Sequence, residues 1–207
     1  MTTVQTVINN SRYDLQDFGS QKWDDVQLLS YLNRIVSIID DTLIALDSDF
    51  TKTSDTVTLL TGSNTVALPT RCDSIVWVWD STDLLLKEDL DKVMYRFQIN
   101  NGTSTTGNPK YWAYNSSNLY FNISADDDYT LTVYFHQKTD ALALTDNMPF
   151  NGVFDEFIRE SIVSMAFRTK DKAIPAVDQQ FYGTFKRIAE RYVITRNMRH
   201  RTHYIDF

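Results

Sequence analysis

The hydrophobic pattern predicts two helices at the start of the chain. From Asp24 to Leu46, apolar residues recur every three or four positions, which places them on one face of a helix. Asp24 followed by Gln27 is typical of a helix start, because an acidic capping residue suits the positive end of the helix dipole. Residues 3–15 carry a shorter and weaker helical pattern, which Gly19 ends.

The pattern changes after Asp47, where Ser and Thr become frequent and the apolar period falls to two, as in strands. Residues 56–60 and 65–68 flank a Thr-Gly-Ser-Asn turn, and we expect them to form a hairpin. Further strands are predicted at 74–80, 111–114, 118–123 and 129–136, the middle two forming a second hairpin. Residues 84–98 fit no single element, and a short helix from Lys87 is one interpretation.

Helical periodicity returns near the C-terminus. Residues 154–166 place their apolar side chains on one face, 170–175 predict a turn, and a final helix is expected from about Ala176. An amphipathic helix needs partners for its apolar stripe. We therefore expect the stripes of residues 24–46, 152–170 and 176–195 to face one another.

The predicted fold class is α+β: a helical bundle built from N- and C-terminal helices, with an inserted antiparallel β domain that forms a small sandwich or barrel. The predicted domains are 1–48 for the N-terminal helices of the bundle, 49–148 for the inserted β domain, 149–196 for the C-terminal helices and 197–207 for a C-terminal extension.

Composition and charge narrow the classes of function that the sequence allows. Aromatic residues make up 13% of the 207 residues, a level that fits protein contacts or a ring-rich core. The net charge is −7, but residues 151–207 carry ten Lys and Arg against seven Asp and Glu. The acidic remainder disfavours general nucleic-acid binding, which needs a basic face.

The sequence offers little catalytic chemistry. Cys72 is the single cysteine, so no internal disulfide and no four-thiolate metal site can form. His136 falls in the polar-facing phase of a strand, and we expect Asp40 and Asp41 on the exposed face of their helix. No nucleotide-loop, serine-hydrolase or zinc-protease motif is present. We predict a protein that is not an enzyme and uses no cofactor and no metal.

Two acidic or histidine-containing groups leave alternatives open. Asp126, Asp127 and Asp128 form either a solvated turn or a cation site. His200 and His203, with Asp206 nearby, are more typical of a solvated or interfacial tail than of a metal site. The first residues lack the features of a signal peptide and no apolar run is long enough to cross a bilayer, so we expect synthesis in a cytoplasm and no membrane partner.

Four stretches, taken in order, resemble one protein family. They are VQTVINNSRYDLQDF, then WDD leading into LLSYLNRIVSII, then TVTLLTGSNTVALP with GNPKYWAY and NLYFNISADDDYTLTVYFH, and lastly NMPFNGVFDEFIRESIVSMAFR. Together they span nearly the whole chain, and they resemble the head-to-tail adaptor (connector, or head-completion) proteins of short-tailed bacteriophages.

The resemblance implies a virion structural protein at the head–tail interface, made in the host bacterial cytoplasm. Such adaptors form a ring, by expectation of twelve copies, between the portal protein and the tail nozzle or fibre proteins. The ring extends the channel through which packaged DNA passes without sequence-specific binding. Adaptor C-terminal extensions often clip into the portal, and here the corresponding residues are Arg196, Arg199, Arg201, Tyr204, Ile205 and Phe207. A solvated basic helix end is the alternative interpretation of this segment.

Three other functions remain open from the sequence. The chain fits another tail component, such as a gatekeeper or tail-completion protein. An aromatic platform made by Trp77, Trp79, Tyr111, Trp112 and Tyr114 would indicate a carbohydrate-binding module. A pocket that joins Cys72 to a histidine, or that holds perturbed carboxylates, would indicate a hydrolase.

Overall fold

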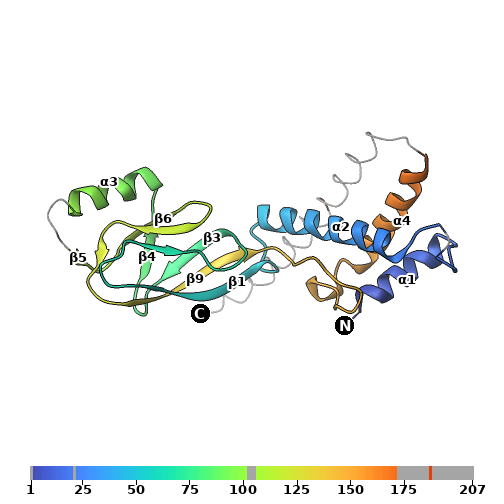
Figure 1. Cartoon of the computed structure of the whole chain (residues 1–207), viewed down its shortest axis with the longest axis horizontal. Coiled ribbons are helices and arrows are strands. Elements are labelled where there is room, and N and C mark those ends of the chain that lie inside the picture. The colour runs from blue at the N-terminus through green and yellow to red at the C-terminus, as the bar shows by residue number, and fades with distance from the viewer. Residues whose placement is uncertain (1, 21, 102–105, 172–186, 188–207) are drawn as a thin grey trace, which may run out of the picture. The chain divides into compact units, whose positions relative to one another are not determined.

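The chain folds into two compact units in the computed structural model, which describes residues 2–20, 22–101, 106–171 and 187 (Figure 1). The helical unit comprises the described residues of Met1–Phe50 and Thr139–Phe207. The β unit comprises those of Thr51–Lys138. Apart from the helix α3 (Leu90–Asn101), which lies in the β unit, helices and strands are segregated along the described chain, and the predicted α+β class is confirmed.

The helical unit contains α1 (Val4–Asp14), α2 (Asp25–Ala45), the short 3-10 helix η1 (Phe150–Gly152) and α4 (Asp155–Asp171). Asp24 caps α2 as predicted, because its side chain accepts a hydrogen bond of 2.7 Å from the backbone amide of Gln27. Helix α4 packs against both α1 and α2. One core joins the three helices, and it includes Ile8, Leu32, Ile39, Phe154 and Ile158.

The predicted bundle has three facing stripes, of which the structure describes two. The stripes of α2 and α4 lie against each other, with Ile35, Leu43 and Ile162 buried in the shared core. The predicted helix from about Ala176 lies outside the described residues, apart from Arg187. The three-stripe arrangement therefore stays a prediction.

The segment that returns from the β unit, residues 139–148, is fixed along α2 by two side chains. Asn33 donates to the carbonyl of Leu142 and accepts from its amide, at 3.1 and 2.7 Å. Asp40 accepts from the amide and the hydroxyl of Thr139, at 2.8 and 3.1 Å. The expectation that Asp40 is exposed was wrong, because its side chain is buried and these hydrogen bonds offset the cost of desolvating it. Asp41 is exposed, as expected.

The same segment, which we call the return strap, also holds the start of α1. The amide of Val4 donates to the carbonyl of Asp146 at 2.9 Å, and the amide of Met148 donates to the carbonyl of Thr2 at 2.9 Å. The strap thereby ties α1 and α2 together, although these two helices contact each other only slightly.

The β unit is built around a seven-stranded sheet with the order β1-β9-β3-β4-β6-β7-β2. Its strands are β1 (Lys52–Leu59), β2 (Thr65–Ala67), β3 (Cys72–Trp79), β4 (Leu84–Lys87), β6 (Tyr111–Tyr114), β7 (Asn118–Phe121) and β9 (Tyr129–Gln137). A separate short pair is formed by β5 (Thr106–Gly107) and β8 (Ser124–Ala125). The edge strands β1 and β2 contact each other, so the sheet is nearly closed.

Two sequence predictions about this sheet were wrong. The first hairpin does not form, because β1 pairs with β9 and β2 pairs with β7. Val57 and Leu59 instead pair with Leu131 and Tyr129, which a local pattern cannot reveal. The predicted second hairpin is confirmed as β6 and β7.

The sheet is also not purely antiparallel, because β4 and β6 are parallel. Parallel neighbours need a crossover connection, and here it includes α3 (Leu90–Asn101), which packs against β6 and β7. Residues 84–98, which fitted no single element, thus form β4 and most of α3. Lys87 ends the strand and does not start the helix.

We expect the contacts of Asn33 with the return strap to stabilise the helical unit. Asn33→Ala leaves two backbone groups of Leu142 without these partners, so the free energy of unfolding falls by about 1–3 kcal/mol. Urea unfolding followed by circular dichroism measures the change. Asn9→Ala, at an exposed α1 position, is the matched control and changes little; equal losses in the two variants would contradict the role of the strap.

We expect the two faces of β9 to differ sharply in their tolerance of truncation. Leu131→Ala empties a fully buried site and lowers the free energy of unfolding by about 2–5 kcal/mol. Thr130→Ala changes the adjacent exposed position and has an effect within about 0.5 kcal/mol. Urea unfolding measures both changes. Similar losses of unfolding free energy in the two variants would show that the side chains of β9 do not alternate between a buried and an exposed face.

Candidate interaction surface

The outer face of the β unit presents aromatic side chains from neighbouring strands. The pairing register sets Trp77 opposite Tyr134 and sets Trp79 opposite Thr132 and Leu84. Residues that alternate with these, such as Val78 and Val133, are buried on the inner face. We call the outer surface of β1, β9, β3 and β4 the sheet face; its residues are Ser54, Thr56, Thr58, Trp77, Trp79, Leu84, Leu86, Thr130, Thr132 and Tyr134.

None of these ten positions is charged, but Lys52 stands in the same phase at the start of β1, and Asp80 and Asp83 line a pocket beside Leu84. Trp77, Trp79 and Tyr134 are 42%, 41% and 38% exposed, and the Trp77 and Tyr134 rings lie 5.5 Å apart. A register shift between Ile75 and Trp77 changes the local twist and aims Trp77 outward. Exposed aromatic rings are typical of the centre of a protein interface.

A pocket of about 290 Å³ lies at the β4 end of the sheet face, between β4 and residues 108–111. Asp80 and Asp83 line it beside Leu84 and Leu86. Burial raises the pKa of Asp80, but hydrogen bonds from Thr82, Asp83 and Asn108 outweigh it and leave the pKa below its usual value. Asp80 therefore remains an ionised acceptor that holds the turn after β3.

The predicted five-ring platform does not form. Trp112 is buried, and its indole nitrogen donates to the carbonyl of Leu85 at 3.0 Å. Tyr111 lies under the guanidinium of Arg96 at 4.5 Å, while the Lys87 ammonium lies 5.1 Å from the Tyr114 ring. Only two of the five rings lie on the sheet face, and Tyr134, which joins them, was missed by the platform prediction. The alternation in β9 already indicated that its side chain points away from the core.

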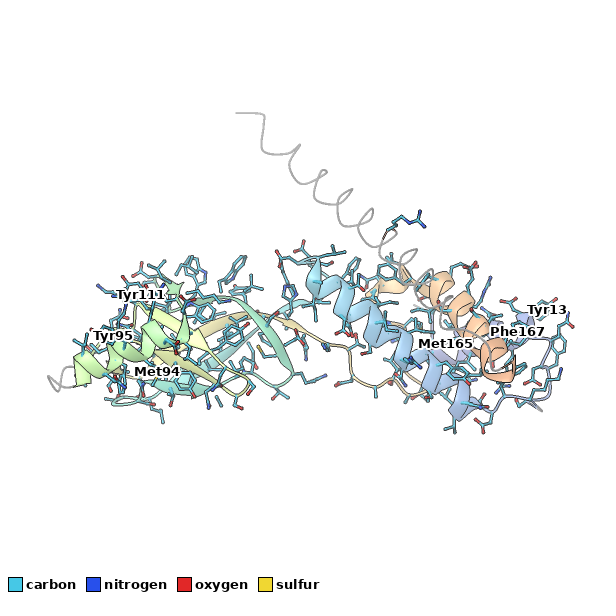
Figure 2. The ribbon with its side chains drawn as sticks, turned by 90° about the horizontal axis from the view of Figure 1, so that it is seen from above. Tyr13, Met94, Tyr95, Tyr111, Met165 and Phe167 are labelled. Atoms are coloured by element: carbon cyan, nitrogen blue, oxygen red, sulfur yellow. The ribbon has the colours of Figure 1, made fainter. Side chains whose placement is uncertain are left out.

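The helical unit has an exposed aromatic pair of its own, at the loop between α1 and α2. Tyr13 and Phe18 are both exposed and meet edge to face, with ring centroids 5.6 Å apart. Figure 2 labels Tyr13, together with Met165 and Phe167 of α4. This pair is a second surface suited to a protein contact.

A buried arginine holds that loop in shape. Arg12 donates to the carbonyl of Trp23 and to the carboxylate of Asp25, both at 2.6 Å, and it pairs with Asp17 at 3.3 Å. Asp17 in turn accepts from the amide of Trp23 at 3.2 Å. Because the buried charges are paired, the loop can present its aromatic residues in a fixed geometry.

The nucleophile and base candidates lie in settings that do not favour catalysis. Cys72 is half-buried at the start of β3, and burial, with a contribution from Asp73, raises its thiol pKa to about 11. His136 is buried, and its Nδ1 lies 2.7 Å from the hydroxyl of Thr51. The ring shares the strand phase of Tyr134, as predicted, but it is buried, and this hydrogen bond satisfies one of its nitrogens there.

The acidic turn is internally hydrogen bonded. Asp128 accepts from the amide and hydroxyl of Thr61, which lowers its carboxyl pKa. Tyr129 donates to Asp126 at 2.6 Å, and this bond raises the tyrosine pKa to about 12. Across the described part of the chain, no group of three or more His, Cys, Asp or Glu side chains has a metal-binding arrangement.

Several candidates lie outside the described residues: His200, His203, Asp206 and the six predicted portal-binding positions Arg196, Arg199, Arg201, Tyr204, Ile205 and Phe207. Their roles stay predictions. No described helix is both long and apolar enough to cross a membrane.

Comparison with known proteins supports the family resemblance. No curated protein matches the chain. A family model described as SU10 adaptor protein matches residues 2–204, nearly the entire sequence. This match agrees with the resemblance to phage adaptors and implies a structural role in the virion, not an enzymatic one. The chain therefore belongs to the SU10 adaptor protein family, a family of phage adaptor proteins.

Proposed function

We propose that this adaptor forms a ring beneath the portal, links the capsid vertex to the tail and extends the channel for packaged DNA. The observation that carries the proposal is the family match over residues 2–204. Twelve copies per ring would match the expected symmetry of the portal. Portal and tail nozzle or fibre proteins are the proposed neighbours above and below the ring.

The surfaces of the protein support an assembly role. The sheet face exposes aromatic rings, and the loop between α1 and α2 exposes Tyr13 and Phe18. The acidic net charge of −7 supports a channel wall that does not grip DNA, because phosphates are attracted to basic surfaces.

The C-terminal extension, residues 197–207 with Arg196 before it, is the proposed portal clip. It combines three arginines and Tyr204, residue types enriched among the hot spots of protein interfaces, with the apolar Ile205 and Phe207.

Mixing the full chain with its cognate portal protein tests the proposed ring. We expect cryo-electron microscopy to show rings stacked on one end of the portal, because portal symmetry offers repeated equivalent sites. Absence of any association would contradict the proposal. Binding to a tail protein without binding to the portal would favour the alternative of a gatekeeper or tail-completion protein.

Deleting residues 197–207 tests the proposed clip. We expect the circular dichroism spectrum and unfolding midpoint to stay close to those of the full chain, while portal affinity falls at least about tenfold. A shortened chain that docks normally would contradict the clip. The variant Lys138→Ala, at an exposed position far from the deletion in sequence, is a control that keeps full affinity.

A further inference from the structure

Helix α4 follows the longest left-handed stretch of backbone among the described residues. All three residues of η1, Phe150, Asn151 and Gly152, have positive φ angles, of 58°, 54° and 75°. The other non-glycine residues with positive φ in the described part of the chain, such as Gln16 and Asp47, occur singly. Because only glycine adopts this region freely, a phenylalanine there is strained. Strained backbone persists only where its surroundings enforce it, and it clusters where proteins change conformation.

The first turn of α4 breaks two further local rules. The residue before the helix is Phe154, whose side chain has no acceptor with which to cap the first amides. Asp155, the first helical residue, has a buried carboxylate oxygen, Oδ1, without a hydrogen-bond partner. The start of α2 is built differently, since Asp24 caps it through the amide of Gln27. Conflicts gathered at one place indicate a segment that serves more than one conformation.

A cluster of three aromatic rings holds the strained turn in place. The Phe150 side chain is 9% exposed, and its ring meets those of Phe154 and Phe50 edge to face, with centroids 5.5 and 6.3 Å apart. The rings of Phe50 and Phe154 are themselves 6.3 Å apart. Edge-to-face contacts are favourable, so burial of the Phe150 ring offsets the strain of its backbone. The left-handed turn therefore depends on this one side chain staying buried.

The sequence of the same segment also suits a longer α4. Pro149 has a φ of −69°, as a right-handed helix requires, and it has no amide that a first turn would leave unpaired. In such a helix the amides of residues 155–157 would pair with the carbonyls of 151–153, so no side-chain cap is needed there. The left-handed strain would disappear, and the cost would be the lost contacts of the Phe150 ring.

We propose that η1 is a conformational switch, in which the left-handed turn at 150–152 converts into a right-handed turn that lengthens α4 toward Pro149. The switch acts on the return strap. Met148, the last residue of the strap, holds the start of α1 through its amide, and Asn147 forms a bridge with Thr3. Winding the next residue into α4 pulls on these contacts and frees the start of α1. In the proposed ring, a neighbouring molecule would select one of the two forms; this use rests on the proposed function, whereas the switch is a property of the isolated chain.

Relaxation-dispersion NMR on the full chain tests the switch without any partner. We expect the backbone signals of residues 150–155 to exchange, on the microsecond-to-millisecond timescale, with a minor state populated at about 1%. The Cα chemical shifts of this minor state should be those of a right-handed helix. Absence of exchange at these residues, or a minor state with the shifts of an unfolded chain, would overturn the switch.

Two substitutions at the turn should favour the longer helix. Gly152→Ala places a side chain at a φ of 75°, with its Cβ 3.1 Å from a carboxylate oxygen of Asp155, whereas a right-handed turn accepts alanine readily. Phe150→Leu removes the edge-to-face contacts but keeps an apolar side chain. Each should raise the population of the longer form at least about tenfold, measured by the same NMR experiment.

One substitution should act in the opposite direction, and another serves as the matched control. Asn151→Gly should lower the population of the longer form about threefold, because glycine adopts a φ of 54° freely and disfavours a helix. Gly62→Ala makes the same exchange at a φ of 79° in the β unit, and it should leave the exchange of residues 150–155 unchanged. Equal effects of Gly62→Ala and Gly152→Ala on this exchange would overturn the switch.

Portal binding, measured on the same chain, separates the switch from the proposed function. A chain that shows the exchange but does not bind the portal protein supports the switch and contradicts the ring beneath the portal. A chain that binds the portal protein and shows no exchange at residues 150–155 overturns the switch and leaves the proposed ring in place.

Discussion

Strand β9 is the element on which both the sheet and its connection to the helical unit depend. It pairs with β1 along eight positions and with β3 on its other side, so it joins β1 to the rest of the sheet. Immediately after it, the chain becomes the return strap, whose backbone is held by Asn33 and Asp40 of α2. Local periodicity alone would not bring these segments together, because each contact joins residues far apart in the sequence.

The same long-range pairing explains which parts of the fold the sequence could predict. Helices α1, α2 and α4, and the β6–β7 hairpin, follow from short-range periodicity and from local signals such as the Asp24 cap. The hairpin predicted between residues 56–60 and 65–68 was wrong. The chain does turn between the two segments, but their strands pair with β9 and β7 and not with each other. The parallel pairing of β4 and β6 was not predicted, for a related reason. The helix α3, which connects these two strands, lies in a segment without a clear hydrophobic period.

Two buried polar residues show what hydrophobic periodicity alone cannot predict. Asp40 and His136 occupy positions that alternation or helical spacing leaves outside the core, yet both are buried with specific partners, Thr139 and Thr51. The candidate aromatic platform failed similarly, because rings adjacent in sequence alternate between faces. What a sequence cannot supply here is the register across strands, and that register brings Trp77 and Tyr134 together into an exposed aromatic surface. For an adaptor, such a surface carries more functional information than any titratable group in the described residues.

The discontinuous helical unit has a consequence for synthesis. Helix α2 leaves the ribosome with its apolar stripe uncovered, and its partner α4 follows only after the whole β unit has been translated. At about 5–20 residues per second, that interval lasts about 5–20 s, long compared with hydrophobic collapse. During this time the stripe of α2 lacks α4 as its cover, whereas every described strand of the β unit has already been translated.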